Sequence, residues 1–318
     1  MNKLLQKIAN TLLINVQNIT SLSLFEGKMG VIVFFYHYGQ FSKQGFYTEF
    51  ADGMIDEIFE IIHKRKIHYL SLNELFEIGI VINHLFDESF VEGDKNDVLS
   101  DIDKILLRKS IVQDLRPNPA KMMYLLNRLK WEHQFSKNLF FKNLVEEIIQ
   151  NFMQLRLEVN DGECDSLLYS NHILQFLLQI NGFGIDSEII KNTVNKVFEF
   201  QNASFLIESN VDDLLTFSKQ CATLKKLLNI NPPFQNFFLD VLDSEKAKYK
   251  IEDLWQNLLF FDREDPKIEI DEAQLYYETV TEDFNQQNFV LKGGLTGLGL
   301  GLLKQISLNT NNRFNFFI

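Results

Sequence analysis

The chain has 318 residues, an apolar content of 46% and a formal net charge of −12 at pH 7. This composition suffices for a large core and opposes a nucleic-acid backbone as partner, because that recognition needs a basic patch. Two cysteines do not make a disulfide framework, and the start of the chain lacks the apolar run of a secretory signal. We therefore expect a cytoplasmic protein with no nucleic-acid partner and no membrane span.

Apolar residues recur at helical spacing along nearly the whole sequence. Segments with a one-sided apolar stripe alternate with segments that are apolar all round, and the second kind predicts buried helices. Leu5 to Val16 form the first amphipathic helix, and residues 27–41 form the first buried one. Phe46 to Ile62 then carry a one-sided stripe, and the pair of helices repeats at 72–85 and 98–106.

Further pairs follow at residues 119–155, 167–198 and 214–242, and a weaker one begins near Leu254. Residues 267–270 are expected to be briefly extended. The predicted buried helices begin roughly 40–48 residues apart, a period typical of helical-hairpin repeats. They start near residues 24, 72, 118, 165, 210, 250 and 292.

The last predicted helix combines leucine with many glycines. Glycine costs a helix about 1 kcal/mol relative to alanine, so several together indicate that other atoms approach this backbone closely. A similar pattern with fewer glycines stands at the start of the first predicted buried helix. We therefore expect close packing at Gly27, Gly30, Gly293, Gly294, Gly297 and Gly299.

The most apolar helix is also the last one, so it must be covered by another part of the chain. The terminal units of an open solenoid are instead polar on their outer face. A closed ring, in which the first unit covers the last, fits better. The prediction is a single all-α domain over residues 1–318, an α/α toroid of about seven helical hairpins with inner and outer helix rings.

Three segments carry a resemblance to a known family. They are Ser23-Leu-Phe-Glu-Gly-Lys-Met-Gly-Val-Ile-Val-Phe-Phe, Leu75-Phe-Glu-Ile-Gly-Ile-Val-Ile-Asn-His-Leu and Leu291-Lys-Gly-Gly-Leu-Thr-Gly-Leu-Gly-Leu-Gly-Leu-Leu. These segments resemble inner-helix motifs of lanthionine synthetase C-like proteins, the lanthipeptide cyclases. The resemblance implies the toroid, a precursor peptide as partner and other peptide-modifying enzymes in the same pathway.

The family's activity is addition of a cysteine thiol to a dehydrated residue, with the thiolate held by zinc. A zinc-bound thiol is deprotonated, and catalytic zinc takes three protein ligands and one open position. The family supplies these ligands from Trp-Cys-x-Gly and Cys-His-Gly motifs, and this sequence contains neither Trp-Cys nor Cys-His. The resemblance therefore implies a zinc-free or non-catalytic member, with no cofactor.

The cysteines and histidines of the chain offer one other possible set of zinc ligands. The fallback set is Cys164, His172 and Cys221, which is chemically allowed but does not share one helical face. Free cysteine commonly acts as a small buried hydrophobe. His172 is interpreted as a polar residue at a helix start, and His37 and His84 as hydrogen-bonded core histidines.

Acidic residues stand near the starts of the predicted buried helices. Paired carboxyls about 5–10 Å apart could hydrolyse glycosides, whereas acidic residues in a first helical turn stabilise the helix dipole, and we favour the second role. The acidic stretch 87–103 lacks the ligand order of a calcium loop. The cavity-facing candidates are Glu26, Asp165, Asp212 and Asp213, with Glu74, Glu77 and Asp253 beside them.

Three functions stay open at this stage. The first is a lanthionine synthetase C-like protein that binds a precursor peptide or partner enzymes without zinc chemistry. The second is an active cyclase with a rearranged site. The third is a carbohydrate-active enzyme on a similar helical barrel.

Overall fold

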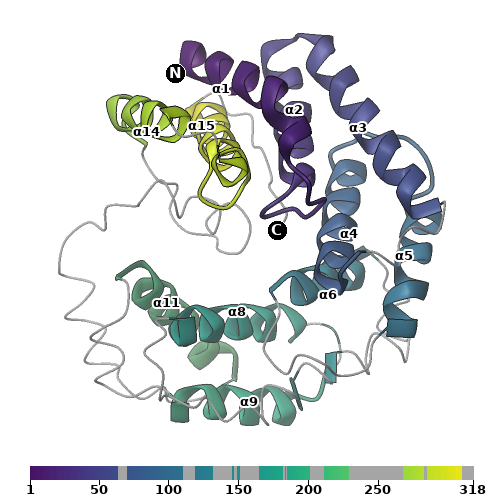
Figure 1. Ribbon diagram of the computed structural model, residues 1–318. Helices are drawn as coiled ribbons and strands as arrows, with labels where there is room; N and C mark the ends of the chain where they lie inside the picture. Colours follow the sequence, from purple (N-terminus) through teal and green to yellow (C-terminus); the bar gives the residue numbers. More distant parts are fainter. Residues whose placement is uncertain are drawn as a thin grey trace. The chain divides into compact units, whose positions relative to one another are not determined.

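The computed structural model describes residues 1–63, 70–109, 119–131, 145–146, 149–150, 165–181, 183, 185–200, 211–228, 268–282 and 285–309. All regular elements within these ranges are helices, so the all-α prediction is confirmed for them (Figure 1). In this part of the chain no helix is both long and apolar enough to span a bilayer. The toroid and its helix rings stay predictions.

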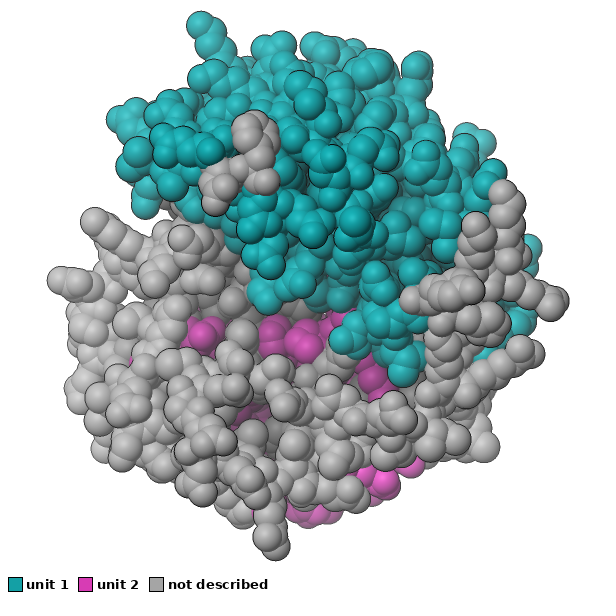
Figure 2. Space-filling model, viewed as in Figure 1, with its two compact units in different colours: residues 1–110, 249–318 teal, residues 111–248 magenta. Residues whose placement is uncertain are grey.

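The chain divides into two compact units, residues 1–110 with 249–318 and residues 111–248 (Figure 2). The first unit therefore joins both ends of the chain. Its helices are α1 (Asn2–Asn15), η1 (Val16–Asn18), α2 (Lys28–Ser42), α3 (Gly45–His63), α4 (Leu72–Asp87), α5 (Lys95–Lys109), α14 (Ile270–Glu282), η5 (Gln286–Asn288) and α15 (Leu295–Asn309). The second unit contains α6 (Pro119–Trp131), α8 (Asp165–Ile180), α9 (Ser187–Phe200) and α11 (Val211–Leu228).

Helix α2 is buried along nearly its whole length, as its sequence predicts. Every residue from Met29 to Gly39 is buried, because a helix without a polar face has to be covered on all sides. Helix α3 instead buries one stripe, which includes Met54, Ile58 and Ile62. Phe46 was expected in that stripe but is 56% exposed.

Helices α2 and α3 form an antiparallel hairpin. The late residue Tyr36 of α2 donates its hydroxyl hydrogen to Asp52 of α3 at 2.6 Å. The Phe35 ring meets the rings of Tyr47 and Phe50 near the start of α3. Helices α4 and α5 pack as the next hairpin, and Lys95 at the start of α5 pairs with Asp87 at the end of α4.

The buried helices of this unit run in the same direction. At the starts of α2 and α15, the backbone N–H of Lys292 donates to the carbonyl oxygen of Phe25 at 2.8 Å. About two helical turns further on, Gly299 of α15 faces the Phe34 ring of α2. Helix α15 also packs on α1 (Figure 1), so the first helices cover the last one, as expected from its apolar sequence.

The glycines at the starts of α2 and α15 share one local geometry. A Cβ atom at Gly27 would overlap the backbone nitrogen and oxygen of Ser23. A Cβ atom at Gly294 would overlap the backbone nitrogen and oxygen of Val290. In both helices the preceding loop therefore folds back onto a glycine four positions later.

The next glycine of each helix repeats the correspondence. A Cβ atom at Gly30 would lie 2.6 Å from the carbonyl oxygen of Leu24. At Gly297 the atom in the way is the carbonyl oxygen of Leu291. The two loop-to-helix junctions are thus structural repeats of each other, although they stand at opposite ends of the sequence. The expectation of close packing at Gly293 is wrong, because nothing lies within 4 Å of a Cβ atom there. Its φ of 69° lies in the left-handed region, which favours glycine for a different reason.

The sequence did not predict helix α14, and residues 267–270 were expected to be extended. Residues 268 and 269 belong to no helix or strand, and α14 begins at Ile270. The Tyr276 hydroxyl of α14 donates to the carbonyl oxygen of Gly293 at 2.6 Å, and the Tyr277 hydroxyl lies 3.0 Å from that of Thr11. Its apolar residues are few, and Leu275 is 65% exposed, which explains the weak signal.

The second unit has its own apolar core, to which α6, α8, α9 and α11 contribute. Helices α8 and α11 lie side by side and run in the same direction. The amide nitrogen of Asn171 donates to the carbonyl oxygen of Asp213 near the start of α11, and further along both helices the amide nitrogen of Gln220 donates to Oε1 of Gln175 at 3.4 Å. The predicted helices at 139–155, 234–242 and near 254 lie wholly or mostly outside the described residues.

We predict that Gly299→Ala destabilises the protein. The new Cβ would lie 2.5 Å from the Phe34 ring, and overpacking of this kind costs about 1–3 kcal/mol. Gly53→Ala is the control, because nothing lies within 4 Å of its new Cβ, and alanine should stabilise this exposed helical position by up to about 1 kcal/mol. Urea denaturation measures both, and equal effects of the two substitutions would contradict the prediction.

Candidate functional site

The interface between α2 and α4 holds the most unusual polar groups of the first unit. Glu77 of α4 is 6% exposed. Its Oε2 atom accepts hydrogen bonds from the backbone N–H groups of Leu24 at 2.7 Å and Phe25 at 3.1 Å. The carboxylate therefore holds the α1–α2 loop, residues 19–27, against α4.

The other carboxylates at this end also make local contacts. Glu74 completes a capping box with Ser71 at the start of α4 and accepts the Ser21 hydroxyl at 3.2 Å. Glu26, a candidate cavity carboxylate, forms an exposed ion pair with Lys292 at 3.2 Å. These three acidic residues all connect the α1–α2 loop to other parts of the unit.

Burial raises the pKa of Glu77 to about 7. The N–H groups of Phe25 and Leu24 and the Ser23 side chain oppose this rise, and the charge of Glu26 adds to it. A carboxyl with such a pKa can hold or release a proton near neutral pH. Its position inside the loop junction fits a structural role better than contact with a substrate.

Two histidines meet further along the same interface. His37 of α2 and His84 of α4 are buried, and their Nε2 atoms lie 2.9 Å apart. One ring must donate and the other accept, so the accepting ring is neutral in this arrangement. The interpretation of both as hydrogen-bonded core histidines is confirmed.

Burial lowers the pKa of both imidazoles. For His37 the second cause is the neighbouring His84, and its pKa falls well below the ordinary value. For His84 the second cause is the charge of Lys95, and its pKa falls to about 3. Neutral imidazoles can accept protons or bind metals, but burial separates this pair from solvent.

A buried lysine near His84 forms an ion pair with the exposed Asp87, and the sequence did not predict it. Lys95 is 5% exposed and donates to Asp87 Oδ1 at 2.7 Å. The amide nitrogen of Asn83 donates to the other carboxylate oxygen at 2.9 Å. Lysine is almost never fully buried without a partner, and nothing in the local sequence marks Lys95 apart from the exposed lysines.

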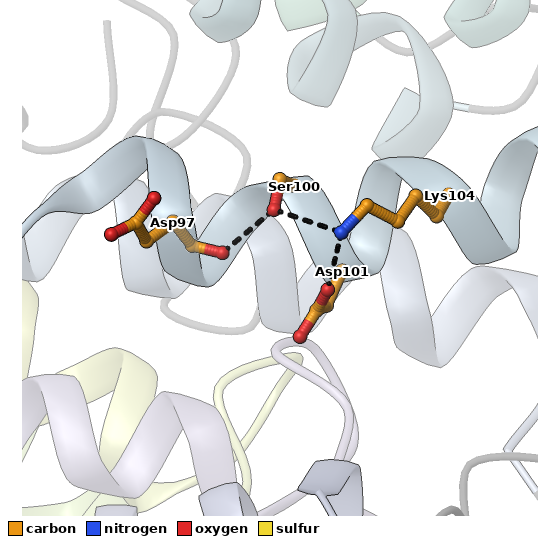
Figure 3. Close-up of polar contacts among 4 residues, drawn as sticks. All are labelled: Asp97, Ser100, Asp101 and Lys104. Carbon is orange, nitrogen blue, oxygen red and sulfur yellow. Dashed lines mark hydrogen bonds and ion pairs between the residues drawn. The ribbon is translucent and has the colours of Figure 1, made fainter.

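The acidic stretch 87–103 uses its carboxylates for helix α5. Asp94 caps the helix by accepting the N–H groups of Asn96 and Asp97. Figure 3 shows Lys104 donating to both Asp101 and Ser100 on the helix surface. Such exposed pairs contribute about 0–1 kcal/mol each.

In the second unit, three candidate carboxylates stand in first helical turns. Asp165 is the first residue of α8, and Asp212 and Asp213 are the second and third residues of α11. These positions suit acidic residues, because they face the positive end of the helix dipole. Asp213 is half-buried, and Asp253 lies outside the described residues.

Of the three residues in the fallback zinc set, the structure describes His172 and Cys221. His172 lies in the middle of α8 and is buried, so its interpretation as a helix-start residue is wrong. Cys221 lies inside α11, and burial raises the pKa of its thiol. Cys164 lies outside the described residues. Among the residues that are described, no three His, Cys, Asp or Glu side chains are grouped as metal ligands.

Comparisons of the chain with protein-family models, with curated proteins and with solved structures found no match. The functional proposal therefore depends on the chain's own residues. The strongest of these are the two repeated glycine junctions and the buried polar groups between α2 and α4.

We predict that the histidine pair makes the protein sensitive to acid. Unfolded histidine binds protons below pH about 6.5, whereas the folded pair resists them, so stability falls as the pH drops from 6.5 toward 3. His84→Gln keeps a polar group near the Nε2 position and removes one titration, so the slope should weaken by up to about 1.4 kcal/mol per pH unit. Urea denaturation between pH 4 and pH 8 measures this, and an unchanged slope would disprove it.

Proposed function

We propose that this protein is a lanthionine synthetase C-like binding protein. In this proposal its helical hairpins close into an α/α toroid, and it binds a precursor peptide or a partner enzyme of peptide modification. It does not add thiols through zinc. The observation that carries the proposal is the repeated glycine junction at the starts of α2 and α15, which joins the two ends of the chain.

The direction of the helices supports a toroidal arrangement. In the first unit α15, α2 and α4 run the same way, and α3 and α5 return antiparallel to their partners. In the second unit α8 and α11 also run the same way. Repeated hairpins of this kind put one helix of each pair in an inner layer and the other in an outer layer.

The cysteines support a zinc-free protein. A zinc cyclase needs a thiol that loses its proton readily, since the coordinated thiol is a thiolate. Burial among apolar side chains of the second unit has the opposite effect on Cys221 and raises its pKa. The sequence also contains none of the paired motifs that supply the family's ligands.

The carbohydrate-active alternative receives no such support. It needs two carboxyls that face a substrate at a suitable separation. Glu77 is hydrogen-bonded to the α1–α2 loop, Glu74 is part of a capping box, and Glu26 pairs with Lys292. These residues therefore serve the structure of the first unit.

Metal content and thiol chemistry test the absence of cyclase activity. We expect substoichiometric zinc in protein expressed with added zinc. We also expect no loss of free thiol when a synthetic peptide with one cysteine and one dehydroalanine is added. Spontaneous cyclisation of the same peptide without protein is the control. Stoichiometric zinc together with protein-dependent thiol loss would establish the active-cyclase alternative.

Peptide binding tests the positive part of the proposal. The probes are short peptides encoded beside the gene, labelled with a fluorophore, with scrambled versions of the same composition as controls. Fluorescence anisotropy should show saturable binding of a natural peptide and none of its scrambled version. If neither peptides nor neighbouring modifying enzymes bind in pull-down experiments with purified components, the proposal is wrong.

A further inference from the structure

The α1–α2 loop is held on two sides. On one side Glu77 of α4 accepts the N–H groups of Leu24 and Phe25. On the other side the Phe25 carbonyl oxygen accepts the N–H of Lys292, just before α15. A single loop thus connects the second hairpin to the last helix. Glu77 holds the loop backbone to α4, and Glu74 adds a bond from the Ser21 hydroxyl.

We propose that Glu77 is a proton-controlled latch, which holds the α1–α2 loop and the docked C-terminal segment closed when its carboxyl is protonated and releases them more readily when it is ionised. The latch is a property of the first unit. It stands apart from the proposed function, so either can fail without the other.

The hydrogen-bond geometry allows both protonation states. Both loop N–H groups converge on Oε2, so a proton on Oε1 leaves the two bonds in place. The ionised form keeps the same bonds but buries a negative charge, which costs several kcal/mol unless it is compensated. Neutral donors compensate for part of that cost.

Among the described residues, the charges near Glu77 do not neutralise its ionised form. The charged side chains described at this end are Glu26 and Lys28 at the start of α2, Glu74 on α4 and Lys292 before α15. Glu26 acts on Glu77 by repulsion, and Lys292 pairs with Glu26. Within the described residues Glu77 forms no ion pair, so its charge is favoured when the loop opens to water.

The sign of the pH dependence follows from this difference. In the open loop Glu77 returns to an ordinary pKa near 4.5, whereas in the closed loop burial raises its pKa to about 7. Between these values the closed state holds a proton that the open state has lost. Opening therefore becomes easier as the pH rises through this window and stays constant above pH 7.

The C-terminal segment should follow the loop. Lys292 contacts it through its backbone N–H, which donates to Phe25, and through its ion pair with Glu26. When the loop opens, Lys292 loses Phe25 and Glu26 as its partners. The amides of the α1–α2 loop and that of Lys292 should therefore share one pH dependence.

Amide hydrogen exchange tests the latch in the full-length protein. NMR measures the exchange of Leu24, Phe25 and Lys292 from pH 5 to pH 8, with correction for the intrinsic exchange rate at each pH. We expect the opening constant to rise by up to about tenfold per pH unit between pH 5 and pH 7 and then to level off. An opening constant that does not change with pH would overturn the proposal.

Two variants locate the effect. Glu77→Gln keeps an oxygen that can accept both N–H groups and cannot ionise, so its opening constant should be flat from pH 5 to pH 8. Glu74→Gln, three residues earlier on the same helix, should keep the wild-type rise. A persistent rise in Glu77→Gln would show that another group is responsible and would overturn the proposal.

A direct titration covers the case in which Glu77→Gln does not fold. The side-chain carboxyl carbon of Glu77 in ¹³C-labelled wild-type protein reports its protonation by chemical shift. A midpoint near 7 supports the latch, and a midpoint near the ordinary value would overturn it.

Discussion

The first unit depends on close contact between backbone and backbone at the starts of α2 and α15. Each helix begins where its own preceding loop lies against a glycine, with the carbonyl oxygens of Leu24 and Leu291 in equivalent places. A side chain at either position would push the loop away. Because the two loops also bond to each other through Phe25 and Lys292, the same contact joins the two ends of the chain.

This arrangement explains why acidic residues gather at one end of the unit. Helices α15, α2 and α4 run in the same direction, so the positive ends of their dipoles lie together. Glu26, Glu74 and Glu77 stand at that end and bind N–H groups, hydroxyls or a lysine. Glu26 and Glu74 bring negative charge to the helix starts, and the hydrogen bonds to Glu77 fix the path of the α1–α2 loop.

Polar pairs between α2 and α4 and between α4 and α5 restrict how these helices can pack. The His37–His84 bond and the Asp87–Lys95 pair, with Asn83 beside it, are satisfied only when the helices keep their present register. A buried polar group without its partner costs about 1–3 kcal/mol. These pairs therefore favour one arrangement, whereas apolar side chains alone would tolerate several.

The sequence by itself determined which helices are buried all round and where backbone contact is close. The apolar run of α2 and the glycines before α15 depend on local composition, so they can be read without a structure. It did not reveal α14, whose apolar face is small, or the position of His172 inside α8. Weak periodicity explains the first error, whereas His172 was misplaced although the predicted start of its helix, near residue 165, agrees with α8.

Tertiary structure alone decided the roles of the polar side chains. Glu74 and Glu77 stand three residues apart on one helix, yet Glu74 caps its own helix while Glu77 is buried under the α1–α2 loop. Spacing along a helix defines a face but not which segment packs against it. The loop's path, set by Gly27 and Gly30, made one carboxyl a cap and gave the other its raised pKa.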